Sequence, residues 1–407
     1  MAAEPAAARG FTPARRLIAG ALVMDLAVAV VGLAVQFKGQ VLGATPLQLG
    51  LLGTFSSLAY TIFCLFTGTI SDRQGRRLLT AVSCIGCGIV WLMLIRADSP
   101  VRLLALMPFS GAFIAMFWPP TQAWLSQLSD TQRALRRNIG DFNLSWTVGL
   151  MIGPPIAGVL WGYSQAVPFL FAAGCMVALV VFMQTVGGGR KRDRAPAGAD
   201  PTPLRHDPAL VRHFLHLAWI ANFAAWFARG LTNVVFPKLG SDLGMSEGLI
   251  GTVIAAFLAG QLVVFIYLRK HSGWQWRLWP LLVALASGCA GMVLSYFART
   301  PMQFTIGLGL SGMGGGVTYF ASLFYSLQGH VSSRGASSGI HEAVLGSGIF
   351  LGPLVGGMVA NSVDLHSPFL LAAAVFALTG IVCWLVWQMR RRRVQAQVRE
   401  AAEVASE

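Results

Sequence analysis

Charged residues are scarce in this sequence of 407 residues. They make up 11% of the chain, against 55% hydrophobic residues, and only 16 of them are acidic. Soluble domains carry about a quarter charged residues, so a chain of this composition cannot keep its whole surface in water. The composition predicts a protein whose main solvent is lipid.

Sequence signatures of catalysis and nucleotide binding are also missing. No G-x4-G-K-[ST] stretch occurs, so the chain carries no P-loop for ATP. The stretch HEAVL at 341–345 has Leu345 where the zinc-binding H-E-x-x-H pattern requires a second histidine. A G-x-G-x-x-G match at 307–312 lies inside an apolar run with no strand before it. We therefore expect no enzyme, no metal site and no cofactor.

Long apolar runs dominate what is present. Each is close to the roughly 20 residues that a spanning helix needs. The runs are uniformly apolar, whereas the strands of a membrane barrel alternate over about ten residues, so helices are predicted. The twelve predicted spans are 17–37, 48–70, 78–96, 101–125, 139–162, 166–186, 214–239, 246–268, 278–298, 301–328, 336–361 and 366–388.

The net charge of +14 would suit a protein that binds nucleic acid, but its placement argues against that interpretation. When the chain is threaded through the twelve spans, most of the 30 basic residues fall on the side that holds both termini. This bias is typical of cytoplasmic loops, so we expect a multi-pass protein of the cell membrane with both termini in the cytoplasm. The four arginines at 390–393 are expected to contact anionic lipid headgroups.

Two Gly-Pro patterns of identical spacing indicate an internal repeat. Each reads G-x8-G-x3-G-P-x3-G, and the second follows the first by 199 residues. The stretches GLLGT (50–54) and GLIGT (248–252) repeat at an offset of 198. The chain is therefore predicted to hold two parallel copies of a six-helix unit, a known transporter arrangement. The pattern consists of Gly140, Gly149, Gly153, Pro154 and Gly158, and then of Gly339, Gly348, Gly352, Pro353 and Gly357; the second copy has an additional glycine, Gly356, before the last one.

A stretch rich in glycine, proline and charge separates the two copies and is typical of a flexible linker. The predicted organisation is an N-terminal tail (1–16), a first six-helix bundle (17–186), the linker (187–213), a second bundle (214–388) and a C-terminal tail (389–407). The predicted fold class is thus an all-α integral membrane protein with 12 transmembrane helices in two pseudo-symmetric six-helix bundles.

A charged loop follows the second span, with the pattern G-x3-D-R-x-G-R-R formed by Gly68, Asp72, Arg73, Gly75, Arg76 and Arg77. This pattern resembles the loop 2–3 signature of the major facilitator superfamily. The Gly-Pro pattern resembles the antiporter motif of the same superfamily, G-x8-G-x3-G-P-x2-G-G. Ala157 replaces one glycine of the final pair in the first copy, whereas the second copy has the full form. The resemblance covers essentially the whole chain.

The resemblance implies two halves that rock about a central site. The places of the motif helices, in spans 5 and 11 of the two halves, predict that they face each other across a pseudo-two-fold axis. The charged loop would latch the halves together when the site faces outward, and Asp130 is a candidate partner for Arg76 and Arg77. The alternative is that these arginines only set the topology. The corresponding loop of the second half, 267–277, lacks the acidic residue, so the latch would be asymmetric.

The preferred function is export of a small solute, coupled to protons, by a monomeric transporter working through alternating access. Aromatic residues in the spans favour an amphipathic solute. Pro108 stands where proton antiporters of the superfamily have an arginine in span 4, so the coupling ion stays open. The alternatives are a symporter or facilitator for a sugar, organic acid or other metabolite, and a non-transporting membrane sensor or scaffold on the same fold.

The seventh span carries a polar stripe. Its members are spaced by three or four residues and therefore share one helix face: Trp219, Asn222, Trp226, Arg229 and Asn233. A charge inside a bilayer usually faces a cavity or a partner. Three roles stay open for Arg229: binding an anionic group of the substrate, pairing with a carboxylate, or snorkelling to the helix end.

Other polar groups in the spans are candidates for coupling or binding. Asp25 is a candidate for proton or substrate coupling, with a structural role as partner of Arg229 as the alternative. His341 and Glu342 are candidates for an inner gate or a protonation site, with helix capping as the alternative. The candidates for lining a cavity, for which aromatic core packing is the alternative, are Trp118, Gln122, Trp146, Tyr319 and Tyr325.

Overall fold

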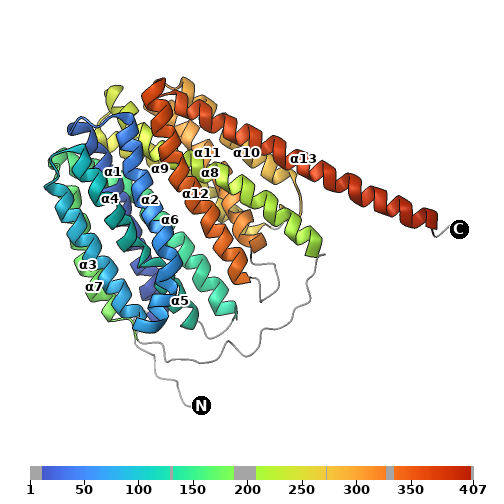
Figure 1. Cartoon of the computed structure of the whole chain (residues 1–407), viewed down its shortest axis with the longest axis horizontal. Helices are drawn as coiled ribbons and strands as arrows, with labels where there is room; N and C mark the ends of the chain where they lie inside the picture. The colour runs from blue at the N-terminus through green and yellow to red at the C-terminus, as the bar shows by residue number, and fades with distance from the viewer. Residues whose placement is uncertain (1–11, 129–131, 188–207, 272, 327–333, 405–407) are drawn as a thin grey trace, which may run out of the picture.

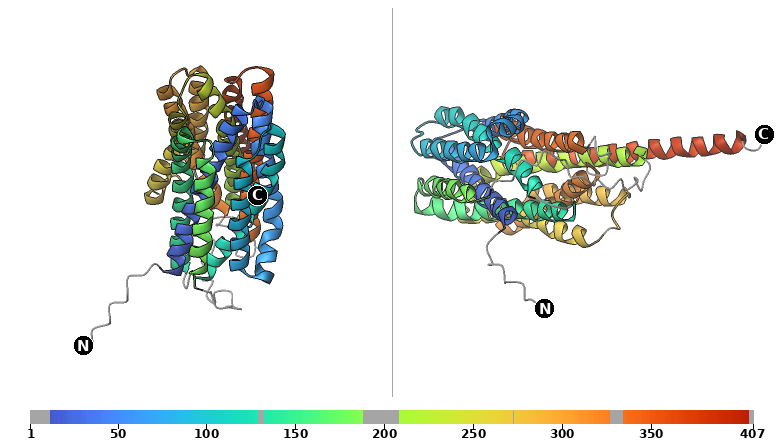
Figure 2. Two further views of the ribbon diagram at one scale, coloured as in Figure 1. Left: turned by 90° about the vertical axis from the view of Figure 1, so that its left-hand side faces the viewer. Right: turned by 90° about the horizontal axis from the view of Figure 1, so that it is seen from below.

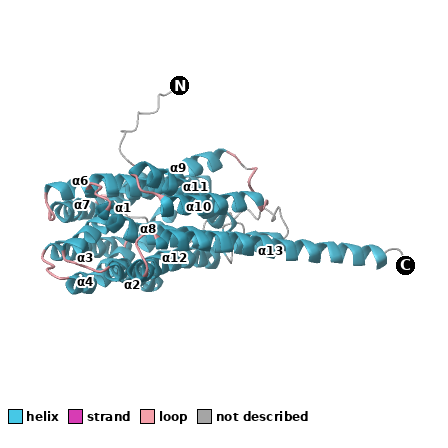
Figure 3. Ribbon diagram, turned by 90° about the horizontal axis from the view of Figure 1, so that it is seen from above, coloured by secondary structure: helices cyan, strands magenta, loops and turns pink. Residues whose placement is uncertain are grey.

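The structure is a computed structural model of the chain, and it describes residues 12–128, 132–187, 208–271, 273–326 and 334–404. The described residues form long helices joined by short loops, and they contain no strand (Figure 3). The prediction of an all-α protein is confirmed.

The first half consists of α1 (Pro13–Val41), α2 (Pro46–Gln74), α3 (Arg76–Ile95), α4 (Pro100–Ala115), α5 (Trp118–Gln127), α6 (Gln132–Tyr163) and α7 (Val167–Gln184). Three of these helices begin in the same way. Thr12, Thr45 and Ser99 each accept a hydrogen bond from a backbone N–H of the first turn, and a proline follows each of them. The hydroxyl satisfies one unpaired amide, and the proline has no amide to satisfy, so both favour a helix start.

The second half consists of α8 (Pro208–Asp242), α9 (Glu247–Lys270), α10 (Trp279–Phe297), α11 (Pro301–Ser326), α12 (Arg334–Ser362) and α13 (Ser367–Val404). The two halves lie side by side in Figure 1, with α1–α7 in blue to green and α8–α13 in yellow-green to red. Their packing repeats: α1 lies along α6, and the equivalent α8 lies along α12.

Three predicted boundaries differ from the structure. The fourth span, 101–125, is not one continuous helix, because α4 ends in a turn at 116–117 and α5 restarts at Trp118 with two prolines in its first turn. The linker is shorter than predicted, since α8 already begins at Pro208. The segment predicted as a C-terminal tail continues α13 to Val404 as a helix that projects beyond the bundle (Figures 2 and 3).

Ten stretches of the described helices are long and apolar enough to cross a membrane, with α4 and α5 counted as one span. The helices α8 and α11 are not among these ten, because their mean hydropathy is too low. The polar stripe of α8 and the many glycines of α11 lower their mean hydropathy, although both helices are long enough to span.

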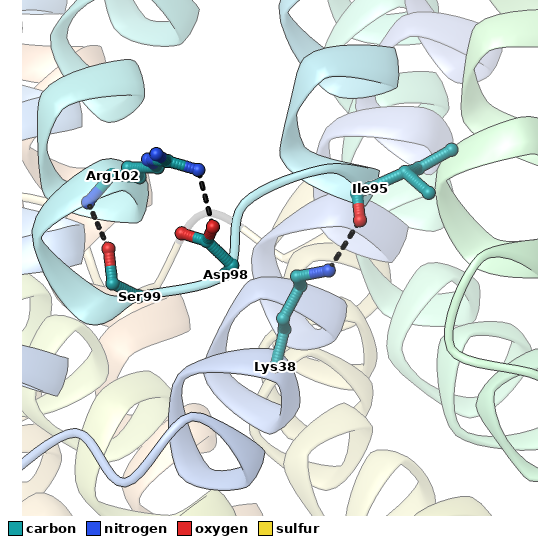
Figure 4. A network of polar contacts seen from close by, with 5 residues as sticks. All are labelled: Lys38, Ile95, Asp98, Ser99 and Arg102. Atoms are coloured by element: carbon teal, nitrogen blue, oxygen red, sulfur yellow. Dashed lines mark hydrogen bonds and ion pairs between the residues drawn. The ribbon is translucent and has the colours of Figure 1, made fainter.

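The two ends of the bundle are defined here by their loops. The far face carries loops 42–45, 96–99, 164–166, 243–246, 298–300 and 363–366, and the near face carries the first residues of α1, α6, α8 and α12. One tie at the far face is drawn in Figure 4: buried Lys38 donates to the carbonyl oxygen of Ile95 at 2.7 Å, which satisfies a terminal carbonyl of α3. The loop beyond it is held by the ion pair of Asp98 and Arg102 (Figure 4).

Candidate functional site

A cavity of about 400 Å³ lies between the two halves. It is lined by α1, α2, α4, α5 and α6 of the first half and by α8, α9, α11 and α12 of the second. Its lining is mostly apolar and aromatic, and the charged residues among the described lining are Asp25, Arg229 and Glu342. A largely apolar cavity with a few convergent polar groups is the usual form of a small-molecule site.

The middle glycines of the Gly-Pro pattern bring each motif helix against the first helix of its own half. A Cβ atom on Gly149 would lie 2.4 Å from the carbonyl oxygen of Leu22 in α1. One on Gly352 would lie 2.3 Å from the carbonyl oxygen of Phe227 in α8. Because real Cβ atoms do not approach so closely, only glycine permits this packing. Gly140, by contrast, meets nothing within 4 Å.

The last glycine of each pattern contacts a helix of the other half at the far face. A Cβ atom on Gly158 would lie 2.1 Å from the carbonyl oxygen of Glu247 in α9, and one on Gly357 would lie 2.9 Å from the Cα of Gly50 in α2. Both motif helices also line the central cavity, but their close backbone contacts between the halves are made with other helices. Each motif helix packs on the GLLGT or GLIGT helix of the opposite half. These backbone contacts hold the two halves tightly together at the far end.

Nine of the predicted coupling and binding residues line the cavity: Asp25, Trp118, Gln122, Trp146, Trp226, Arg229, Asn233, Tyr319 and Glu342. They come from six different helices, α1, α5, α6, α8, α11 and α12. Sequence periodicity placed Trp226, Arg229 and Asn233 on one helix face, and the packing of the two halves turns that face toward the same space as the other six residues.

Asp25 and Arg229 interact electrostatically across the boundary between the halves. Among the described residues, neither has an ion-pair partner within 4 Å, and Nη1 of Arg229 has no hydrogen-bond partner. The guanidinium lies over the ring of Trp226 at 4.7 Å, a cation–π contact. Arg229 is buried and lines the cavity, so it does not snorkel to a helix end.

Three other predicted residues lie away from the cavity lining. Asn222 is fully buried in α8, and its amide atoms have no hydrogen-bond partner among the described residues. His341 is fully buried, and its Nδ1 is hydrogen-bonded to Oγ of Ser322 at 2.7 Å. The hydroxyl of Tyr325 accepts from the backbone N–H of Trp276 at 2.9 Å. Tyr325 follows Tyr319 by six residues, which on a helix places it on a different face.

The charged loop is described only in part. Gly75 ends α2 with a φ of +98°, a conformation that favours glycine. Arg77 donates to the carbonyl oxygen of Val186 and lies 5.9 Å from the ring centre of Trp124. The side chain of Asp72, like Gly68 and Asp130, lies outside the described residues, and so do the surroundings of Gly339. The latch therefore stays a prediction.

Several lining residues were missed by the sequence analysis. Gln36 lies three helical turns after Asp25, on the same face of α1, and that spacing could have revealed it. Ser56 and Tyr60 of α2 lie one turn apart and also line the cavity. The apolar lining residue Phe257 of α9 carries no sequence signal that separates it from other core phenylalanines.

Comparison with known proteins decides the family. The model of the Major Facilitator Superfamily matches residues 17–219 and again residues 218–406. The chain belongs to the major facilitator superfamily. Among curated relatives, this superfamily member is 22% identical to the quinolone resistance protein NorA of Staphylococcus aureus over 88% of this chain and 91% of that one. It is 30% identical to an uncharacterized MFS-type transporter of Methanocaldococcus jannaschii, over 36% of this chain and 38% of that one.

Solved structures of transporters share the fold. The nucleoside transporter NupG superimposes with a TM-score of 0.72 at 11% identity, covering 92% of this chain and 100% of that one. A bacterial homolog of the human lysosomal transporter Spinster, in an inward-facing and occupied conformation, gives a TM-score of 0.71 at 14% identity over 92% and 96% of the two chains. The protein is thus a multi-pass membrane transporter of the superfamily and not an enzyme.

Proposed function

We propose that this transporter exports a small amphipathic solute by alternating access, in exchange for protons. The observation that carries the proposal is the cavity between the halves, in which Asp25 of the first half faces Arg229 of the second. Glycine contacts pack the two halves together at the far end, which supports a cavity closed on that side. The excess of basic residues on the near face supports a cytoplasmic near face in the cell membrane, and hence an inward-facing state.

The coupling follows from simple electrostatics. In its charged form Asp25 attracts Arg229 across the boundary, which stabilises the arrangement in which the far ends of the halves are packed together. Proton binding removes the charge of Asp25 and with it this attraction, and such attractions are strong in a poorly solvated site. For exchange, Asp25 would take up its proton while the cavity is open at the far face and release it at the near face. There the restored attraction to Arg229 stabilises the inward-facing state that accepts the next solute, so that one proton enters each time a solute leaves.

Export is supported by the resemblance to a quinolone resistance protein along most of both chains. The second candidate is a symporter or facilitator for a sugar, organic acid or other metabolite. It is favoured by the fold that this chain shares with a nucleoside transporter; at 11% identity, this likeness shows a common fold and does not show a common substrate. We further propose a monomer whose near-face arginines contact anionic headgroups.

The test is flux in proteoliposomes. A thermal-shift screen of small solutes on the purified protein selects the transported compound, and its uptake is then measured with and without a pH gradient. We expect saturable flux that the gradient accelerates, and flux without this acceleration in Asp25→Asn. Asp98→Asn, which removes an exposed far-face carboxylate, is the matched control and should behave as wild type.

Two results would change the proposal. Flux that ignores the pH gradient in the wild-type protein would indicate a facilitator. The absence of saturable flux for every compound that stabilises the protein would favour the sensor or scaffold.

A further inference from the structure

The charges of the cavity do not balance. Asp25 and Arg229 interact with each other, whereas Glu342 has no ion-pair partner within 4 Å among the described residues. Its side chain is exposed, and the space to which it is exposed is the cavity. The described lining thus holds two carboxylates and one guanidinium, which leaves one negative charge available. A charge held in a poorly solvated site is costly unless a counter-charge meets it.

Glu342 lies on the face of α12 that looks into the cavity. Residues 345, 346, 349 and 353 follow it at helical spacing and line the same space. His341, one position earlier, is turned away from the lining and held by Ser322 of α11. The carboxylate therefore points into the cavity and not into the packing of the second half.

Aromatic rings from both halves line the same cavity as this carboxylate. Tyr319 of α11 and Tyr60 of α2 are both within electrostatic range of Glu342. The ring of Tyr319 lies 5.9 Å from that of Trp146 in α6 and 6.0 Å from that of Trp226 in α8. Trp226 already holds Arg229, whereas Trp146, which contacts Tyr319, and the two tyrosines hold no cation in the described structure and are left for a ligand.

This combination selects the charge of the ligand. Aromatic faces attract cations, and rings arranged around a cationic centre are the usual means of recognising a substituted ammonium group. A carboxylate beside them adds a charge of the matching sign. The largely apolar remainder of the lining suits a hydrophobic body. We infer that the transported solute is an amphipathic organic cation whose positive centre binds between Glu342, Trp146, Tyr319 and Tyr60.

That this cation is transported rests on the proposed function, but its binding site can be tested without transport. Equilibrium dialysis of the purified protein in detergent, against protein-free micelles, compares two ions of the same shape and opposite charge. The probes are tetraphenylphosphonium and tetraphenylborate. We expect the cation to bind with a Kd at least tenfold lower than that of the anion.

The variants separate the carboxylate from general effects of charge. Glu342→Gln should raise the Kd for tetraphenylphosphonium at least tenfold without weakening the binding of tetraphenylborate. Asp98→Asn removes the same charge at the exposed far face and should leave both Kd values within twofold of wild type. Glu342→Asp keeps the charge and should stay closer to wild type than Glu342→Gln, and Trp146→Leu should weaken the cation alone.

Three outcomes overturn the inference. Tighter binding of the anion would assign the site to the unpartnered Nη1 of Arg229. Equal binding of both ions would mean that the apolar lining alone recognises the solute. Binding of tetraphenylphosphonium within twofold of wild type in Glu342→Gln would remove Glu342 from the site. If Glu342→Gln is not monodisperse, Trp146→Leu takes its place and should weaken the binding of the cation alone. Its control is Phe257→Leu, which changes an apolar lining residue and should change the binding of both ions equally. If the wild-type protein binds the cation as expected but shows no pH-dependent flux, the proposed function is contradicted and the cation site is not.

Discussion

The two Gly-Pro helices present related but unequal faces to the cavity. At positions 199 residues apart, α6 has Asn143 and Trp146 where α12 has Glu342 and Leu345. The indole N–H of Trp146 donates to the side-chain oxygen of Asn143 at 3.1 Å, so this amide is partly satisfied within its own helix. Leu345 offers no donor to Glu342. The helix α6 thus carries a neutral amide that is bonded to its neighbour, whereas α12 carries a carboxylate that is free for a ligand.

The same helices are far more alike where they touch the opposite half. Gly158 of α6 and Gly357 of α12 both bring backbones into contact at the far face, and the approach is tighter at Gly158. The duplicated glycines therefore build a symmetric frame, while the residues that differ between the copies carry the chemistry of the cavity. The following predictions test this division between frame and chemistry.

The largest effect is expected for Gly158→Val. Its Cβ atom would lie 2.1 Å from the Glu247 carbonyl oxygen, and backbone cannot yield as a flexible side chain can. Overpacking typically costs about 1–3 kcal/mol, which here falls on the closed far face alone and shifts the equilibrium by roughly 5- to 150-fold. We expect solute flux to fall by at least tenfold. An added Ile254→Cys substitution reports opening at the far face, because Ile254 lines the cavity and the six native cysteines all lie within helices away from the far-face loops. This position should be labelled more by a membrane-impermeant thiol reagent.

Gly162→Val is the matched control, because a Cβ atom there meets nothing within 4 Å, one turn further along α6. It should leave flux and labelling within twofold of wild type. Gly357→Val should lie between the two, since its contact is looser. Equal behaviour of Gly158→Val and Gly162→Val would show that the glycine contacts do not hold the far face closed.

The second prediction moves the charge between the two copies. Glu342→Asn should weaken the binding of tetraphenylphosphonium at least tenfold. The double variant Glu342→Asn with Asn143→Glu returns one carboxylate to the same cavity, beside Trp146, and should recover binding to within about threefold of wild type. Dialysis of both variants gives the comparison. A double variant that binds no better than the single one would mean that Glu342 acts through its place in α12 and not through its charge.

Sequence spacing anticipated much of this architecture for a physical reason. Spanning helices need long apolar runs, so their number and order could be read directly, and a repeated glycine pattern marks repeated close packing. The helical period also placed Trp226, Arg229 and Asn233 on one face, and all three line the cavity.

What spacing could not supply is which neighbour each face meets. Tyr325 and Tyr319 look equivalent in the sequence, yet only Tyr319 lines the cavity, because Tyr325 packs beside Phe214 and the loop before α10. The pairing of α6 with α9 was missed for the same reason. Periodicity defines the face of one helix, whereas contacts between halves depend on how two bundles are rotated against each other.

The third prediction concerns the loops that follow the second span of each half. The first has Asp72 and three arginines, whereas the second is basic and is anchored by the hydrogen bond from Trp276 to Tyr325. If only the first loop is a latch, Asp72→Asn should lower solute flux several-fold while expression and tetraphenylphosphonium binding stay unchanged. Lys270→Gln removes an exposed basic residue of the second loop, and as the control it should change flux by less than twofold. Unchanged flux in Asp72→Asn would rule out the latch.

The smallest effect is expected at the buried pair of His341 and Ser322. Position 142, the equivalent of His341 in α6, holds the buried apolar Phe142, so this polar pair belongs to the second half alone. Ser322→Ala would leave Nδ1 of His341 buried without its hydrogen bond, at a cost of about 1–3 kcal/mol. We expect the thermal unfolding midpoint in detergent to fall by a few degrees with unaltered tetraphenylphosphonium binding. Ser347→Ala, whose hydroxyl bonds only to the carbonyl of Val344 in its own helix, should cost less. If Ser322→Ala instead weakened cation binding as much as Glu342→Gln, the His341 pair would be part of the site, and the asymmetry between α6 and α12 would extend beyond the cavity lining.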